Sequence, residues 1–90
     1  MIDIVKIVRV ETLGDFRLRL RFSDGMEGER DFPDIVAESG SMIAPLKDAA
    51  FFARVFVELG ALTWPNGFDL DSIALHDDMK DSGALRRTAA

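Results

Sequence analysis

The residue types most capable of chemistry in this chain are a single histidine and several aspartates near its C-terminal end. A histidine that acts as a general base needs a positioned partner and a pocket. Asp77 and Asp78 follow His76 directly, and adjacency along the chain does not bring a carboxylate to the imidazole ring. We therefore expect His76 to be a surface or packing residue near the end of a helix.

Four aspartates close together raise the question of a calcium site: Asp69, Asp71, Asp77 and Asp78. A calcium loop supplies oxygen ligands from its first, third, fifth and twelfth positions and has glycine at the sixth. Counted from the first of these aspartates, the fifth, sixth and twelfth positions are Ile73, Ala74 and Lys80, so the pattern fails. We predict no metal site and interpret Asp71 as a helix N-cap.

Other residue types that support catalysis are also missing. The chain has no cysteine and no tyrosine, which excludes a thiol nucleophile, a cysteine-ligated zinc, a disulfide scaffold and a tyrosyl base. Its serines lack the Gly-x-Ser-x-Gly context of an exposed nucleophile. Its glycines do not form a phosphate-binding loop before a long helix. We predict no catalytic residue, no cofactor and no enzymatic activity.

Three arginines alternate along one short segment and could form a basic stripe: Arg17, Arg19 and Arg21. The chain as a whole is acidic, with 16 acidic and 11 basic residues and a net charge of −5, so it does not attract a phosphate backbone over its whole surface. Charges that recur at the period of a strand usually mark its solvated face. We therefore do not expect this chain alone to bind nucleic acid, whereas a protein partner is compatible with the acidic balance.

The size and composition predict one small folded domain. Of the 90 residues, 48% are hydrophobic and 30% are charged, as in ordinary globular chains. The longest uncharged run, 59–68, has ten residues, whereas a bilayer span needs roughly 20. The first residues lack the basic flank and apolar core of a signal peptide. We expect a cytoplasmic protein of bacterial type with no membrane association.

The first third of the chain predicts a three-strand meander. The strands are expected at 4–11, 16–22 and 26–32, and the turns contain Leu13-Gly14-Asp15 and Ser23-Asp24-Gly25. In 16–22, leucine and phenylalanine alternate with arginine without interruption, which is typical of a strand with one buried face. The Asp-Gly pair supplies the positive φ that a tight hairpin needs.

Short helices are predicted after this meander. Pro33 favours the first position of a helical turn that includes 34–38. Residues 39–47 are expected to form a loop with a buried middle. Asp48 is expected to cap a helix that ends near Ala53, because its carboxylate can accept from the free amide groups of the first turn.

A two-strand hairpin is predicted next, with strands over 54–59 and 61–64 and a turn at Gly60. Pro65-Asn66-Gly67 ends the second strand, because proline cannot donate to a ladder and Asn-Gly favours a tight turn. Trp64 is expected to cover the rim of the core with its N–H bonded at the edge. The alternative is that it presents a stacking surface to a partner.

The C-terminal part is predicted to be a helical turn over 72–76, capped by Asp71, followed by a polar segment without an apolar period. The domain prediction is therefore one α+β domain over 1–76 and a polar, disordered tail over 77–90. The fold prediction is a mostly antiparallel sheet of about five strands. The meander and the hairpin supply these strands, and short helices pack on one side.

Three short patches, in this order and at these distances, are shared with a known family: Phe22-Ser23-Asp24-Gly25; the set Leu46, Asp48, Phe52 and Val55; and Trp64-Pro65-Asn66-Gly67 followed by Asp69. On these patches the chain resembles the domain-of-unknown-function 2442 family of small bacterial proteins, from about residue 4 to 76. The third patch is the most specific. The family often has tyrosine after the leucine near its end, whereas His76 follows Leu75 here, so an aromatic contact is not predicted there.

The resemblance implies an α+β domain with a mostly antiparallel sheet and no established enzymatic activity. Members of the family resemble two kinds of component: stand-alone proteins encoded beside another small protein, as in toxin–antitoxin pairs, and modules fused to a helix-turn-helix domain. We expect this chain to be of the stand-alone kind. The candidate interaction positions are those of the first and third patches: Asp24, Gly25, Trp64, Pro65, Asn66, Gly67 and Asp69.

The leading functional hypothesis is a non-catalytic protein-interaction module, as the antitoxin-like or regulatory half of a two-gene pair. The alternative is a small-ligand-sensing domain with a pocket between the sheet and Phe51 and Phe52, which are more simply core residues. A homodimer is a further expectation, because a domain of this size buries only about two-thirds of its chain's surface by itself.

Overall fold

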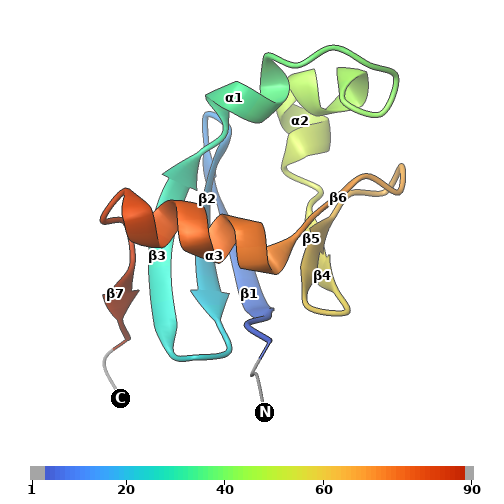
Figure 1. Cartoon of the computed structure of the whole chain (residues 1–90). Coiled ribbons are helices and arrows are strands. Elements are labelled where there is room, and N and C mark those ends of the chain that lie inside the picture. Colours follow the sequence, from blue (N-terminus) through green and yellow to red (C-terminus); the bar gives the residue numbers. More distant parts are fainter. Residues whose placement is uncertain (1–3, 89–90) are drawn as a thin grey trace.

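The computed structural model describes residues 4–88 (Figure 1). In this range the elements follow in the order β1 (Ile7–Gly14), β2 (Arg17–Phe22), β3 (Met26–Asp31), α1 (Pro33–Val36), a 3-10 helix η1 (Ala44–Lys47), α2 (Ala49–Phe52), β4 (Phe56–Glu58), β5 (Ala61–Thr63), β6 (Asp69–Leu70), α3 (Ser72–Asp81) and β7 (Arg86–Arg87). No helix in the described range is long and apolar enough to cross a membrane. The α+β class with antiparallel sheets is confirmed.

A four-stranded antiparallel sheet with the order β1-β2-β3-β7 forms the larger part of the molecule. The alternation predicted for 16–22 determines its two faces, because successive side chains of a strand point to opposite sides. Leu18, Leu20 and Phe22 are buried on the inner face. Arg17, Arg19 and Arg21 lie on the opposite, outer face.

Helix α3 crosses the inner face of this sheet (Figure 1). Asp71 caps it as predicted, and its carboxylate accepts a hydrogen bond from Ala74 N at 3.2 Å. Leu75 and Met79 lie one helical turn apart and are both buried against the sheet. On β3, Gly28 faces Met79, and the absence of a side chain there lets the helix and the following backbone approach closely.

A second antiparallel sheet, with the order β4-β5-β6, lies beside β1. Leu62 and Trp64 carry its buried side, and both side chains are completely shielded from solvent. The Trp64 ring packs against Phe52 and Phe68 with centroid distances of 5.6 and 5.7 Å. These contacts join the small sheet to the common core.

Short helices follow β3 and precede β4 in the sequence, and residues within or next to each of them explain why they form. Pro33 occupies the first turn of α1, where its missing N–H leaves no bond unmade. Asp48 caps α2 as predicted, with its carboxylate 3.2 Å from Ala50 N. The 3-10 helix η1 lies inside the predicted loop and buries Leu46. These turns close the core at one end of the molecule.

The sequence predicted one sheet of about five strands, whereas the structure has two sheets and two more strands. The missed strands, β6 and β7, have two residues each, so they carry no alternation that a sequence pattern could show. The predicted domain boundary at His76 is also corrected, because α3 continues to Asp81 and β7 pairs with β3. Residues 1–3 of the predicted domain and 89–90 of the predicted tail lie outside the described residues.

The close approach at Gly28 gives a test of the packing of the C-terminal segment. A Cβ atom at this position would overlap the carbonyl group of Ala84 and lie 3.1 Å from Met79 Cε. We expect Gly28→Ala to lower the free energy of unfolding by about 1–3 kcal/mol, the usual range for overpacking. Urea denaturation measures this change, with Ser39→Ala on the exposed loop as a control. Equal stability of G28A and wild type would contradict this packing.

Candidate functional site

The turn between β2 and β3 belongs to the first family patch and is closed by its own residues. The Asp24 carboxylate accepts a hydrogen bond from Met26 N at 3.0 Å. Gly25 has a φ of 87°, which glycine adopts without strain. The predicted tight turn is therefore present, with both residues of the Asp-Gly pair in the expected roles.

The same turn holds two segments that are distant in sequence. Ser23 exchanges hydrogen bonds with the backbone of Lys6, from Lys6 N to Ser23 Oγ at 2.9 Å and from Ser23 N to Lys6 O at 2.7 Å. The Gly25 carbonyl accepts from Thr88 N at 2.9 Å and from its Oγ1 at 3.0 Å. The turn thus connects the start of β1 to the chain that follows β7.

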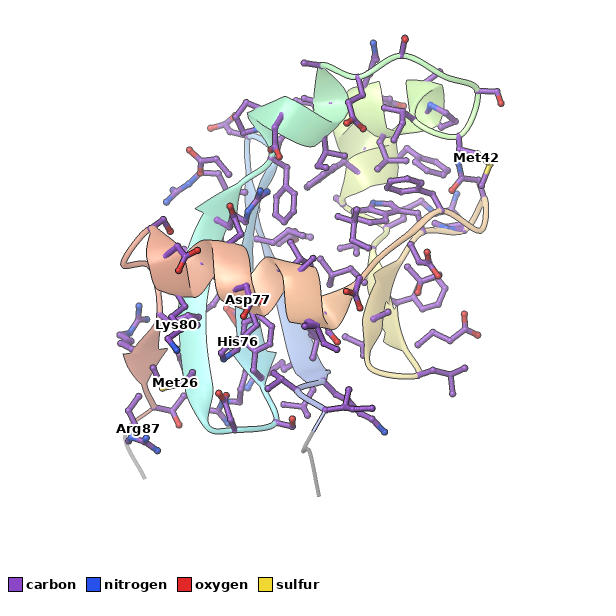
Figure 2. The ribbon with its side chains drawn as sticks, viewed as in Figure 1. Met26, Met42, His76, Asp77, Lys80 and Arg87 are labelled. Carbon is purple, nitrogen blue, oxygen red and sulfur yellow. The ribbon has the colours of Figure 1, made fainter. Side chains whose placement is uncertain are left out.

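His76 is the third distant contact of this turn. Its Nε2 lies 2.8 Å from Asp24 Oδ2, and its ring packs edge-on against Phe22 with a centroid distance of 4.9 Å. Figure 2 shows the side chain projecting from α3 toward the four-stranded sheet, where it is 13% exposed. The expectation of a packing histidine agrees with this position. The aspartate partner and the aromatic contact were not predicted, because Asp24 is 52 residues away.

The charge state of Asp24 is adjusted by these contacts. Burial raises its pKa, while the hydrogen bonds from Met26 and His76 and the charge of His76 lower it. The result is a pKa of Asp24 below its ordinary value of 3.8. Because His76 lies on α3 and Asp24 lies in the β2–β3 turn, this pair acts as a clasp between the two.

The third family patch is also a structural turn. Asn66 donates from Nδ2 to Met42 O at 3.0 Å and accepts at Oδ1 from Phe68 N at 3.2 Å. Gly67 has a φ of 90° and donates to Trp64 O at 2.9 Å. These bonds fix the path from β5 to β6 and hold the loop that contains Met42. Pro65, Gly67 and Asp69 remain exposed around the turn.

Trp64 lies deeper than the predicted rim position. Its side chain is fully buried, and its Nε1 donates to Phe52 O at 2.9 Å. A partner therefore cannot stack on this ring. Of the candidate interaction positions, Asp24, Gly25 and Asn66 serve mainly to hold other segments.

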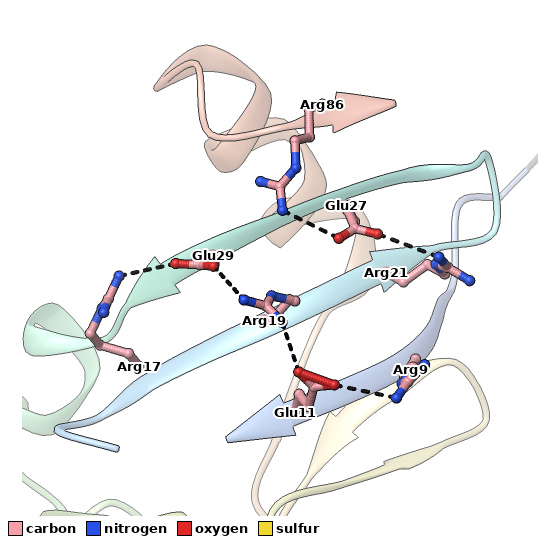
Figure 3. A network of polar contacts seen from close by, with 8 residues as sticks. All are labelled: Arg9, Glu11, Arg17, Arg19, Arg21, Glu27, Glu29 and Arg86. Atoms are coloured by element: carbon pink, nitrogen blue, oxygen red, sulfur yellow. Dashed lines mark hydrogen bonds and ion pairs between the residues drawn. The ribbon is translucent and has the colours of Figure 1, made fainter. Parts of the chain in front are cut away.

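The outer face of the four-stranded sheet carries a network of ion pairs (Figure 3). Arg19 on β2 lies between Glu11 on β1 and Glu29 on β3, at 2.9 and 2.8 Å. This row follows the strand register, in which these three residues are direct cross-strand neighbours. The hydrogen bond from Arg19 lowers the pKa of Glu29 despite some opposing desolvation.

The remaining arginines of this face are paired in the same way. Arg17 contacts Glu29 at 3.2 Å and Asp31 at 2.7 Å, and Arg21 contacts Glu27 at 3.4 Å. The predicted stripe of arginines is thus present, but acidic neighbours on both adjoining strands balance its charge. A neutralised stripe attracts phosphates weakly, which favours the interpretation as a solvated strand face.

The largest hollow described lies between α1, β6 and α3 and has a volume of about 250 Å³. Arg30 lies at its edge and connects α1 to α3 through ion pairs with Asp34 at 3.1 Å and Asp78 at 2.8 Å. The three hollows described are lined by residues other than Phe51 and Phe52. Phe52 is instead buried in the core.

Three exposed apolar residues lie on β1 and on the β4–β5 hairpin beside it, and we call Val8, Phe56 and Leu59 the junction patch. Ile7 N donates to Gly60 O at 2.9 Å, so Val8 and Leu59 flank this hydrogen bond. The exposed fractions are 55% for Val8, 41% for Phe56 and 97% for Leu59. The strand register shifts between Ile7 and Arg9, so Val8 stands at a bulge.

Leu59 has an unusual backbone for its residue type. Leu59 and Gly60 form the two-residue loop between the paired residues Glu58 and Ala61, with φ values of 51° and 81°. A loop with two positive φ angles favours Asn-Gly, because the left-handed conformation costs other L-residues roughly 1–2 kcal/mol. Leu59 was expected at the end of the strand predicted over 54–59, so its left-handed backbone was not predicted. The sequence did hold one signal for this conformation. Leu59-Gly60 is the two-residue loop of the β4–β5 hairpin, and a loop of this length commonly needs two positive φ angles.

The fold is a small α+β domain built of two antiparallel sheets and short helices, with structural turns in two of its three sequence patches. The model of the family described as "Protein of unknown function (DUF2442)" matches residues 7–79, and the chain belongs to this family. No curated protein and no solved structure matches the chain.

The clasp between Asp24 and His76 predicts a dependence of stability on acid. Because the pKa of Asp24 is lower in the folded protein, its contribution to stability is complete above about pH 5 and is lost as the pH falls through the folded pKa. We expect Asp24→Asn to lower the free energy of unfolding by about 1 kcal/mol at pH 7. The difference from wild type should shrink below about pH 4.

Urea denaturation between pH 3 and pH 7 measures this difference. Asp77→Asn, which replaces an exposed carboxylate on the same helix, is the matched control. A difference between wild type and D24N that is unchanged from pH 7 to pH 3 would contradict the assigned role. A double-mutant cycle with His76→Ala isolates the contribution of the pair.

Proposed function

We propose that this protein is a non-catalytic protein-interaction module that recognises a partner protein through the junction patch. The observation that carries the proposal is Leu59, a leucine with a left-handed backbone and a side chain 97% exposed to solvent. Exposed apolar residues that gather on a small domain commonly mark a binding surface.

Two unfavourable contributions to stability at Leu59 support the proposal. The backbone of Leu59 is strained for its residue type, and its apolar side chain gains nothing from burial within the domain. Strained residues concentrate at functional sites, where another requirement outweighs stability. A leucine at the tip of a hairpin can enter a partner's pocket and form the buried centre of an interface.

The role in the cell follows from the family resemblance and the charge. We propose that the chain is the antitoxin-like or regulatory half of a two-gene pair in the bacterial cytoplasm. Its net charge of −5 favours association with a basic partner. In this role, docking of Leu59 and Phe56 masks a surface that the partner needs for its own activity.

The substitution Leu59→Asn separates binding from folding. Asparagine tolerates the left-handed conformation, so we expect L59N to raise the free energy of unfolding by up to about 1 kcal/mol. The same substitution removes the apolar anchor, so we expect a loss of partner binding of at least about tenfold. Co-expression of the tagged chain with the neighbouring reading frame, followed by titration of the purified complex, measures binding.

Met42→Ser is the control, because Met42 is also an exposed apolar residue but lies in the loop held by Asn66, outside the junction patch. It should leave partner binding unchanged. Either of two results would count against the proposal: no stoichiometric complex with the neighbouring protein, or a complex whose affinity L59N leaves intact.

A further inference from the structure

We infer that the junction patch binds a second copy of this chain, in a two-fold symmetric dimer that excludes the partner. The inference rests on the proposed function, because it concerns the same surface. It states which molecule binds this surface when the partner is absent. The charges on either side of Leu59 are the observation that identifies this occupant.

In a two-fold symmetric dimer, the contact surface of each copy must be complementary to itself. Both copies use the same patch, so a residue close to the two-fold axis meets its own counterpart, and a residue away from the axis meets a different one. Apolar side chains can lie on the axis, because they pack against themselves without repulsion. Charged side chains satisfy the symmetry when opposite charges lie on opposite sides of the axis.

The junction patch meets this demand. Leu59 is the exposed apolar tip of the hairpin, and Glu58 precedes it. Gly60 follows Leu59, and it packs so closely against Lys6 that a Cβ atom on Gly60 would lie 2.8 Å from Lys6 Cβ. The residues before and after Leu59 therefore bring an anion and a cation to the same hairpin tip.

Within residues 4–88, neither Lys6 nor Glu58 takes part in an ion pair, because the pairs in this range join arginines or His76 to other carboxylates. With Leu59 on a two-fold axis, Lys6 of each copy faces Glu58 of the other. Exposed pairs of this kind set the orientation of an interface more than its affinity, which comes from the apolar centre.

The charge pattern favours a copy of the chain as the occupant in the free protein. The tip of the hairpin carries one charge of each sign, and a second copy supplies the opposite charge to each of them. Val8, at the bulge of β1, and Phe56, at the start of β4, are the other exposed apolar residues of the patch. Dimer and partner complex therefore compete for one surface.

Sedimentation equilibrium of the purified chain, from about 1 µM to 1 mM at 0.15 M salt, tests the inference. We expect a reversible dimer in the wild type and a dissociation constant at least about tenfold higher in L59N. Met42→Ser should dimerise like wild type. Circular dichroism and thermal unfolding of each variant show that it is folded.

Charge reversal tests the geometry. Lys6→Glu and Glu58→Lys should each weaken the dimer by about three- to tenfold, because each places like charges opposite one another. The double variant K6E/E58K exchanges the two charges and should return to within about threefold of wild type. Failure of this rescue, or a wild type that stays monomeric at the highest concentration, would overturn the inference.

The two proposals fail in different ways. A monomeric wild type whose partner complex is lost in L59N overturns the dimer and leaves the interaction module standing. A dimer that L59N disrupts, with no complex of the neighbouring protein, supports the dimer and removes the proposed partner. If both are present, titration of the dimer with the partner should convert it to a complex that contains one copy of this chain.

Discussion

A turn of four residues, Phe22 to Gly25, connects three segments that are distant from one another in sequence. Phe22 and Asp24 both contact His76 of α3, Ser23 bonds Lys6 just before β1, and Gly25 bonds Thr88 after β7. The inner face of the large sheet is covered only when α3 lies across it. The contact from Asp24 to His76, the ion pair from Arg30 to Asp78 and the hydrogen bond from Ser72 to Val5 O fix α3 in that position.

The residues that make the family patches distinctive therefore serve the fold. Asp24 and Asn66 each use a short polar side chain to close a turn and to reach a distant segment at the same time. Burial of the Trp64 ring removes the one large aromatic surface of the third patch from reach of a partner. The residue with the clearest sign of an outside role, Leu59, belongs to none of the patches. In this domain, residues that identify the fold and residues proposed to bind a partner are different sets.

Local signals explain what the sequence could predict. The alternation over 17–22, the caps at Asp48 and Asp71 and the Asp-Gly turn act within a few residues of themselves, and all of them appear in the structure. Phe16, predicted as the first residue of this strand, lies in the preceding turn with a φ of 60°. The sequence could not show that the hairpin forms a sheet of its own, nor that β7 pairs with β3, since tertiary contacts determine both. The continuation of α3 was hidden because buried Met79 lies among charged residues. The position of Leu59 was missed because leucine ordinarily avoids the backbone that it has here.

The long-range hydrogen bonds of the β2–β3 turn have a consequence for the rate of folding. The bond between Asp24 and His76 joins residues 52 positions apart, and the bond between Gly25 and Thr88 joins residues 63 positions apart. The hydrogen bond between Ser72 and Val5 spans 67 positions. The chain must lose the entropy of closing these large loops before the contacts that stabilise them can form. We therefore expect this domain to fold more slowly than a helical bundle of the same length, with the three-strand meander forming before the rest.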